Sequence, residues 1–169
     1  MTKILDVDFG KPKIDLGRFS DLLCGEYERL RTYYYTCMPF QSCPVTDEER
    51  RRFASMDKFV YTLKKLPRFE VKLGRLGCIG GEYIQKRVDI ALAVDLVRLG
   101  CSKAIGKAIL VTGDSDFVPA IEAAKDMGVL VELYYSLSSI HDELLSAVDQ
   151  SFLIDEILIR QVERVIDFQ

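Results

Sequence analysis

An apolar run that leads directly into a cluster of acids constrains this chain most. Residues 108–111 are all apolar, and Thr112-Gly113-Asp114-Ser115-Asp116 follows at once. A short apolar run bounded by glycine predicts a buried parallel strand, and ligand sites of open α/β sheets lie at the carboxyl ends of such strands. Two carboxylates one residue apart at that edge can hold a hard divalent cation. Ser115 is expected to be the N-cap of the following helix. Alternatively, Asp114 and Asp116 only cap that helix and favour its dipole.

Strand and helix patterns alternate along the rest of the chain. Strands are expected over 29–36, 69–76, 129–135 and 152–154, with a short opening strand over 3–9 and a turn over 77–81. Helices are expected after Asp15, from the capping box Thr46-x-x-Glu49 to 66, from 89 to Gly100, from 116 to Gly128, from the capping box Ser139-x-x-Asp142 to 148, and over 155–168. This alternation predicts an α/β fold, a three-layer α/β/α sandwich with a mainly parallel sheet.

The composition excludes several classes of protein. The chain has 169 residues, the length of a single domain, and 49% of them are apolar, which is typical of a globular core. The net charge of −3 gives no global positive field, so any surface that binds nucleic acid must be local. We see neither a signal peptide nor an apolar run long enough to span a membrane, and we expect a cytoplasmic protein.

Carboxylates are the chemical groups that this chain has in quantity. Its five cysteines, an odd number without secretory context, predict reduced thiols. There is no Cys-x-x-Cys pair, and His141 is the only histidine. A zinc site and a Ser-His-Asp or Cys-His catalytic site are therefore not expected. The 26 aspartates and glutamates remain.

Three aspartates are the candidate catalytic and metal-binding residues. Asp89 lies near the start of an apolar helix, and the topology can bring it to the same sheet edge as Asp114 and Asp116. Asp95, six positions along that helix, points to the opposite side and is expected to cap or pair structurally. A cluster of acids without histidine suits Mg²⁺ or Mn²⁺, which can activate water and neutralise charge on a phosphodiester.

Basic and hydroxyl side chains are candidates for substrate binding. Lys86 and Arg87 precede the helix of Asp89 and could clamp a phosphate, and Thr112 and Ser115 adjoin the other acids. A second basic group lies on the helix that follows Thr46: Arg50, Arg51, Arg52, Lys58, Lys64 and Lys65. Such a group is most often a solvated face, and contact with a phosphate backbone is the alternative.

Two motifs give the chain a resemblance to a known family. Residues 86–89 read Lys-Arg-Val-Asp ahead of the apolar helix, and residues 112–117 read Thr-Gly-Asp-Ser-Asp-Phe. They resemble the Lys-Gly-x-Asp and Ser-Gly-Asp-x-Asp-Phe motifs of the NYN domain (LabA-like), a branch of the PIN-like nuclease superfamily. The resemblance extends over residues 15–149. It implies a Rossmann-like PIN fold and cleavage of RNA, single-stranded in our expectation, with Mg²⁺ or Mn²⁺ at Asp89, Asp114 and Asp116.

The chain departs from that family at two places. Arg87 replaces the usual glycine. Family members also open with a hydrophobic strand that ends in Asp-x-x-Asn, whereas residues 1–14 contain no asparagine. Either Asp6 or Asp8 substitutes through a shortened loop, which makes Asp6 a further candidate metal ligand, or the first strand is absent or degenerate. In the second case we expect a catalytically impaired protein that binds RNA or regulates.

The amino-terminal segment supports one further enzymatic alternative. Residues 3–8 (KILDVD) resemble the nucleophile motif of haloacid-dehalogenase-like phosphatases, in which the first aspartate, here Asp6, attacks phosphorus. The later acid of that family would fall on Val118 or Pro119, and its intermediate motifs are not evident. The ribonuclease is therefore the preferred interpretation.

The same segment bears on domain organisation and assembly. We expect residues 1–169 to form a single NYN/PIN-like domain, with a truncated or degenerate first strand in 1–14 and a helical extension over 151–169. Loss of a first strand would leave an open slot in the sheet, and an unpaired slot invites filling by another chain or by residues 3–9. This predicts a homodimer.

Overall fold

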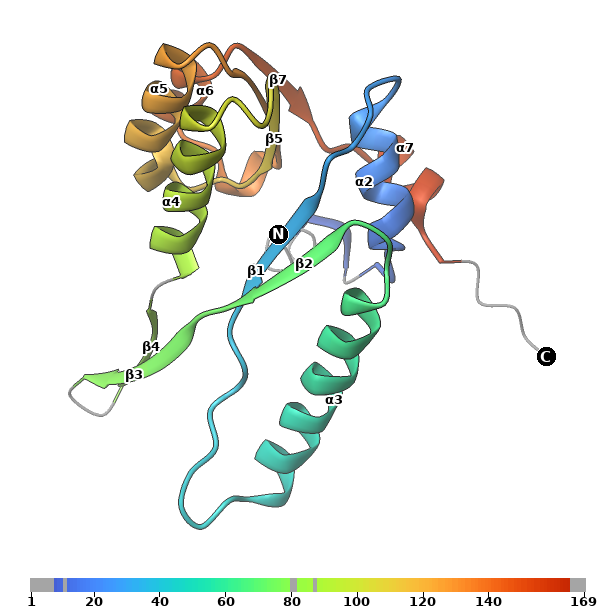
Figure 1. The fold of residues 1–169 in the computed structure, drawn as a ribbon. Helices are drawn as coiled ribbons and strands as arrows, with labels where there is room; N and C mark the ends of the chain where they lie inside the picture. The colour runs from blue at the N-terminus through green and yellow to red at the C-terminus, as the bar shows by residue number, and fades with distance from the viewer. Residues whose placement is uncertain (1–7, 11, 80–81, 87, 165–169) are drawn as a thin grey trace. The chain divides into compact units, whose positions relative to one another are not determined.

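The computed structural model describes residues 8–10, 12–79, 82–86 and 88–164 of the chain, with only the backbone described over 75–79 and 82–86. Its internal contacts divide the protein into two compact units (Figure 1). Unit 1 comprises Met1–Glu28 and Ala93–Gln169, and unit 2 comprises Arg29–Leu92. The chain passes from one unit to the other after Glu28 and again within helix α4 (Val88–Cys101).

Unit 1 is built on a three-stranded parallel sheet. Its strands are β5 (Lys107–Val111), β6 (Leu130–Tyr135) and β7 (Gln150–Leu153), in the order β5-β6-β7. Val131 and Leu133 of the central strand are completely buried, as parallel strands covered on both faces require. The parallel strand predicted ahead of the acid cluster is confirmed as β5, in which Ala108 and Leu110 are buried whereas Ile109 and Val111 are half-buried.

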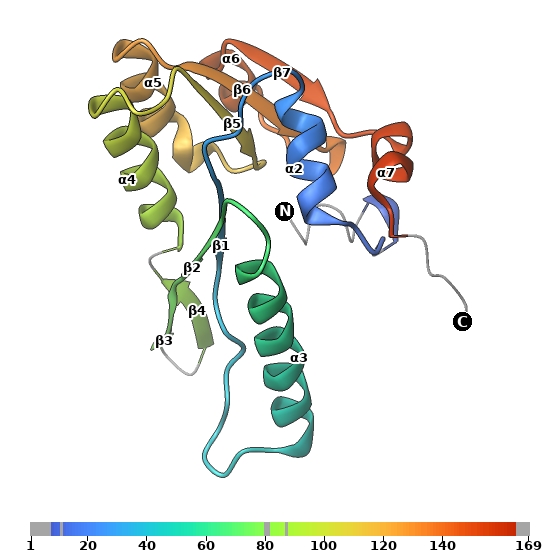
Figure 2. The same ribbon diagram turned by 45° about the vertical axis from the view of Figure 1, so that its right-hand side comes forward.

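Helices lie on both sides of this sheet. Helix α5 (Val118–Asp126) packs on β6 and against α6 (Asp142–Ala147) on one side, while α2 (Leu16–Cys24) and α7 (Glu156–Val162) contact each other on the other side (Figure 2). Fully buried Ile121, Leu144 and Val162 contribute to the core. This arrangement confirms the predicted α/β class with helices on both sides of a parallel sheet.

Local signals in the sequence explain where the helices of unit 1 begin. Asp15 caps α2 by accepting hydrogen bonds from the backbone N–H groups of Gly17 (2.9 Å) and Arg18 (3.1 Å), as predicted. Asp155 caps α7 in the same way, through the N–H of Leu158 at 2.8 Å. An isolated bridge between Ile14 and Glu163 joins the two segments.

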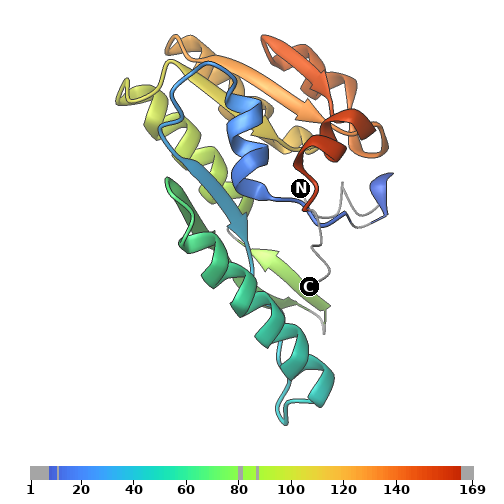
Figure 3. The same ribbon diagram turned by 90° about the vertical axis from the view of Figure 1, so that its right-hand side faces the viewer.

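Unit 2 pairs two parallel strands with one long helix. Strands β1 (Thr32–Thr36) and β2 (Phe69–Leu73) are connected by α3 (Asp47–Lys64), which packs on β2 (Figure 3). The Tyr34 and Phe59 rings meet edge to face, with centroids 5.6 Å apart. The predicted capping box is present, since Glu49 N–H donates to Thr46 Oγ1 and Thr46 N–H donates to the Glu49 carboxylate.

The prediction of a turn over residues 77–81 was wrong. Strand β3 (Arg75–Ile79) pairs antiparallel with β4 (Glu82–Lys86), so that a β-hairpin separates β2 from α4. The three glycines of this segment suggested irregular structure, yet Gly77 lies within a strand and pairs with Ile84. The connection between the two strands falls at Gly80 and Gly81, outside the described residues.

Three smaller expectations also changed. Helix α4 ends at Cys101 rather than before Gly100, and Lys103 takes the left-handed conformation (φ 51°) expected of a glycine cap. Of the expected opening strand, residues 1–7 lie outside the described residues, and Asp8 and Phe9 are helical. Helix α7 ends at Val162, before the predicted end at 168.

The described helices include none that is both long and apolar enough to cross a membrane.

Candidate functional site

The predicted acid cluster forms a tight turn at the carboxyl end of β5. The buried hydroxyl Oγ1 of Thr112 accepts a hydrogen bond from Asp114 N–H at 3.2 Å. The carboxylate of Asp114 in turn accepts from Asp116 N–H at 3.0 Å and caps the short 3₁₀ helix η1 (Ser115–Phe117), which leads into α5. The predicted N-cap at Ser115 was therefore wrong, because Asp114 performs that role one residue earlier.

Gly113 brings this turn against the segment that follows β6. A Cβ at position 113 would lie 2.5 Å from the Oγ of Ser139 and 2.8 Å from its Cβ, closer than real Cβ atoms come to other atoms. Ser139 ends the 3₁₀ helix η2 (Leu137–Ser139). The carboxyl ends of two neighbouring strands, β5 and β6, therefore meet at this contact.

The segment after β6 contributes hydroxyl groups that were not among the predicted site residues. Ser136 is completely buried, and its Oγ lies 3.4 Å from Ser138 Oγ. Among the buried side-chain nitrogen and oxygen atoms of the described residues, the Oγ of Ser139 is the one without a hydrogen-bond partner. The predicted capping box at Ser139 is absent, since His141 precedes α6 without a side-chain cap. Serines directly after a parallel strand were the signal that could have placed this segment at the site.

Asp114 and Asp116 have the chemistry of ligands for a hard cation. Both are exposed, and neither forms an ion pair with a basic side chain of the described residues. The hydrogen bond to Asp116 N–H uses one carboxylate oxygen of Asp114, Oδ1. Mg²⁺ needs only one or two protein carboxylates, because it retains several waters. No group of three or more His, Cys, Asp or Glu residues suited to a metal ion occurs in the described part of the chain.

Asp89 lies in unit 2, also beside the carboxyl end of a parallel strand. It is exposed in the first turn of α4. Burial, followed by the negative charge of Asp89, raises the pKa of the Cys37 thiol, against a hydrogen bond with the Gly74 backbone. Cys37 follows β1 directly, and Gly74 follows β2, where its N–H donates to Thr36 O at 2.8 Å. The convergence of Asp89 with Asp114 and Asp116 of unit 1 stays a prediction.

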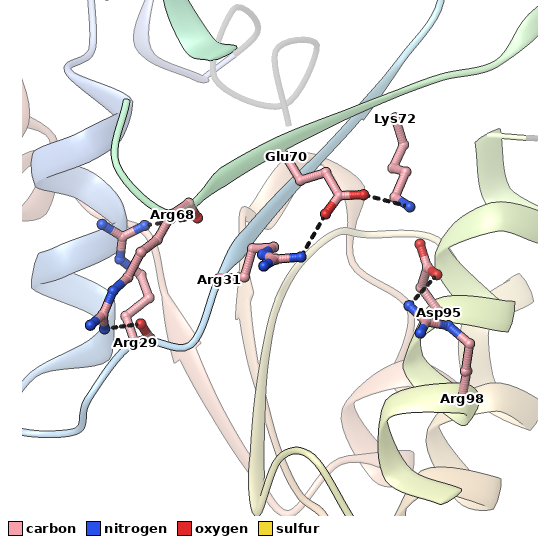
Figure 4. A network of polar contacts seen from close by, with 7 residues as sticks. All are labelled: Arg29, Arg31, Arg68, Glu70, Lys72, Asp95 and Arg98. Atoms are coloured by element: carbon pink, nitrogen blue, oxygen red, sulfur yellow. Dashed lines mark hydrogen bonds and ion pairs between the residues drawn. The ribbon is translucent and has the colours of Figure 1, made fainter. Parts of the chain in front are cut away.

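The remaining predicted residues fall in different places. Lys86 is the last residue of β4, and Ser115 opens η1 beside Asp114. Asp6 and Arg87 lie outside the described residues. Asp95 is buried in α4 and pairs with Arg98, with 3.1 Å between Arg98 Nη2 and Asp95 Oδ1, so that its predicted structural role is confirmed (Figure 4).

Unit 2 carries its own network of charged side chains, formed by Glu70 and Lys72 of β2 and by Arg31, which directly precedes β1. The carboxylate of Glu70 lies 2.7 Å from Lys72 Nζ and 2.9 Å from Arg31 Nη1 (Figure 4). These hydrogen bonds, with that of Lys72 first, lower the pKa of Glu70. Tyr33, on the neighbouring strand, lies beneath Lys72 at 5.7 Å from the ring centroid. The acid of this network is thus neutralised within the unit, in contrast to Asp114 and Asp116.

Comparisons with known proteins identify a family and a fold. The family profile described as the NYN domain matches residues 7–156. An uncharacterised protein from Sinorhizobium fredii is 39% identical over 64 residues, which are 38% of this chain and only 29% of that protein. A crystal structure of a protein of unknown function from Vibrio parahaemolyticus superposes with a TM-score of 0.69 and 17% identity, covering 96% of this chain and 89% of that one.

Proposed function

Because the chain belongs to the NYN domain family, which is a PIN-like nuclease family, we propose that it is a metal-dependent ribonuclease that hydrolyses RNA phosphodiesters at a cluster of aspartates. One observation carries this proposal. Asp114 and Asp116 are exposed and not neutralised by any described basic residue, at the carboxyl end of a parallel strand where α/β folds bind ligands.

Asp114 and Asp116 would hold Mg²⁺ or Mn²⁺, with Asp89 as the third acid and Asp6 as a further ligand. When bound, such an ion supplies an acidified water and neutralises charge on the phosphodiester. The chain's own contribution is positioning. The N–H of Asp116 fixes Asp114 Oδ1, which leaves the second oxygen of that carboxylate for the cation.

The proposed contacts to substrate come from residues around these acids. Thr112, whose Oγ1 already accepts from Asp114 N–H, holds the shape of the turn. Ser115 lies next to the acids and would bind a non-bridging phosphate oxygen. Lys86 and Arg87 would supply positive charge to the same phosphate. The partner is RNA, single-stranded in this proposal, and the free thiols of Cys24, Cys37, Cys43 and Cys101 suit a cytoplasmic location.

Cleavage of labelled single-stranded RNA with Mg²⁺ or Mn²⁺ tests the proposal. We expect Asp114→Asn to lower the rate at least 100-fold, because it removes a charged ligand. Glu122→Gln is the matched control, since Glu122 is an exposed carboxylate on α5. Equal rates for wild type and Asp114→Asn would reveal a contaminating nuclease and overturn the proposal.

Metal binding provides a readout that does not depend on turnover. A cation that binds only the folded protein raises its melting temperature. We expect Mn²⁺ to stabilise the wild type and Glu122→Gln but not the Asp114→Asn/Asp116→Asn double variant. Stabilisation of all three proteins to the same extent would show that the cation binds elsewhere.

The same assays separate the alternatives. RNA binding without any cleavage would favour a catalytically impaired NYN-domain protein with an RNA-binding or regulatory role. A phosphoryl group trapped covalently on Asp6 would instead identify a haloacid-dehalogenase-like phosphatase. We also propose a homodimer, and light scattering that shows a monomer at high concentration would contradict it.

A further inference from the structure

The basic residues of helix α3 fall into two different sets. Arg50 Nη1 lies 3.3 Å from Asp47 Oδ1, and Arg52 Nε lies 3.9 Å from Glu48 Oε1. The four other cations of this segment are exposed and form no ion pair with a described residue: Arg51, Lys58, Lys64 and Lys65. The unpaired cations are the ones whose charge is available to an external partner.

Three of these cations, Arg51, Lys58 and Lys65, form a row on one face of the helix, whereas Lys64 lies on another face. The three are seven residues apart, close to two full turns, so that each lies about 10 Å along the axis from the next. The helix ends at Lys64, and Lys65 continues it as a C-cap in helical conformation. The buried residues Val60 and Leu63 face away from this row. The row is therefore a solvent face of unit 2, opposite the packed side of α3.

Asp47 and Glu48 precede Arg51 in the first turn and pair with Arg50 and Arg52. Beyond that turn the neighbours of the row are neutral, and one of them is aromatic. Small or hydroxylated residues occupy the intervening positions of this face: Ala54, Ser55 and Thr62. Tyr61 is 60% exposed, and Lys65 Nζ lies 4.3 Å from the centroid of its ring. An exposed ring beside a cation is the combination on which proteins stack unpaired bases.

We propose that this row, which we call the α3 stripe (Arg51, Lys58, Tyr61 and Lys65), binds the backbone of single-stranded RNA, with Tyr61 stacking against a base. The choice of RNA as the occupant rests on the proposed function and on charge complementarity. The chain has a net charge of −3, so that a polyanion requires a local cationic surface. A membrane surface fits poorly, because membrane-bound helices oppose their cations with a bulky apolar face that inserts into lipid, whereas the apolar face of α3 packs in unit 2.

Binding of a fluorescent oligouridylate, measured by anisotropy in EDTA at several salt concentrations, tests the stripe. The stripe variant is Arg51→Gln/Lys58→Gln/Lys65→Gln, and the control is Arg50→Gln/Arg52→Gln/Lys64→Gln, which removes the same charge from the same helix. Each phosphate contact contributes about 0.7 to the slope of log K against log salt for single strands. We expect the stripe variant to lower the magnitude of this slope by about 2 and to bind RNA at least about tenfold more weakly at low salt. The control is expected to keep most of the wild-type salt slope and most of the wild-type affinity.

Tyr61→Ala is expected to weaken binding several-fold without changing the salt slope, because stacking releases no counterions. Identical losses in the two triple variants would overturn the proposal. So would wild-type RNA binding by the stripe variant combined with stripe-dependent binding to phosphatidylserine vesicles. All substituted positions are exposed, and the melting temperature of each variant verifies folding.

The outcome is separable from that of the proposed function. If RNA is not cleaved but the stripe variant loses binding, the ribonuclease proposal fails and the stripe stands. If cleavage depends on Asp114 while the two triple variants behave alike, the ribonuclease stands and the stripe fails.

Discussion

Gly113 and Ser139 approach so closely that no side chain fits between them. A Cβ at position 113 would lie 2.5 Å from Ser139 Oγ and would also clash with the Ser139 backbone oxygen. The contact holds the turn that carries Asp114 against the segment after β6. A glycine is required here by the lack of space, since its φ does not lie in the left-handed region.

We therefore expect Gly113→Ala to be destabilising. Relieving the clash requires a backbone shift, and overpacking of this kind costs about 1–3 kcal/mol. Gly106→Ala is the matched control, because nothing lies within 4 Å of a Cβ at position 106. Urea denaturation of the two variants compares them directly, and equal stabilities would contradict the packing seen at position 113.

Ser139→Ala is expected to have the opposite effect. The Oγ of Ser139 is buried without a hydrogen-bond partner, so that its removal relieves a desolvation penalty. We expect unfolding free energy to stay the same or to rise by up to about 1 kcal/mol. Ser136→Ala removes a hydroxyl that lies 3.4 Å from Ser138 Oγ and serves as the comparison. A loss of more than about 1 kcal/mol in Ser139→Ala would show that its hydroxyl is satisfied in solution.

The ion pair between Lys107 and Glu132 provides a further test of packing within unit 1. Lys107 Nζ lies 2.5 Å from Glu132 Oε1, and the Glu132 side chain is only 7% exposed. Removing one partner of a buried pair leaves the other charge unpaired, at a cost of about 3–5 kcal/mol. We expect Lys107→Met to lose about 3 kcal/mol and Lys107→Met/Glu132→Leu to recover most of it. A double variant no more stable than the single one would contradict this account.

Local signals in the sequence were sufficient for much of the fold. The capping box of Thr46 and Glu49 starts α3, and Asp15 starts α2, both as predicted. A cap is predictable because it depends only on residues a few positions away. The apolar run 108–111 became β5, since such a run is typical of a parallel strand, although only Ala108 and Leu110 of it are buried. The position of Asp114 and Asp116 in a turn directly after this strand, and the structural role of Asp95 within its helix, were likewise predictable from local sequence.

Features that depend on distant contacts were not predictable in this way. The β3–β4 hairpin contains a glycine in a strand, where pairing with the partner strand overrides local preference. The same pattern that starts α3 occurs at Ser139 and Asp142 but yields no cap, because Ser139 is instead packed against Gly113. The convergence of Asp89 with Asp114 depends on tertiary placement of two separate units and stays a prediction.

The carboxylate of Glu49 gives unit 2 a defined pH dependence. Ser42 Oγ donates to it at 2.6 Å and Thr46 N–H at 2.9 Å, and these hydrogen bonds lower the pKa of Glu49 from 4.5 to about 2. A group whose pKa is lower in the folded protein binds its proton more readily when unfolded. Its stabilisation is therefore complete above pH 4.5 and is lost as the pH falls from there towards 2.

We expect the wild type to lose more unfolding free energy between pH 6 and pH 3 than Glu49→Gln does, because glutamine has no proton to bind over that interval. Urea denaturation at the two pH values measures the difference. Glu48→Gln is the control, since Glu48 is 81% exposed and lies 3.9 Å from Arg52. Between pH 6 and pH 3, Glu48→Gln should lose as much unfolding free energy as the wild type. If Glu49→Gln also loses as much as the wild type, the hydrogen bonds from Ser42 and Thr46 do not favour the ionised carboxylate in solution.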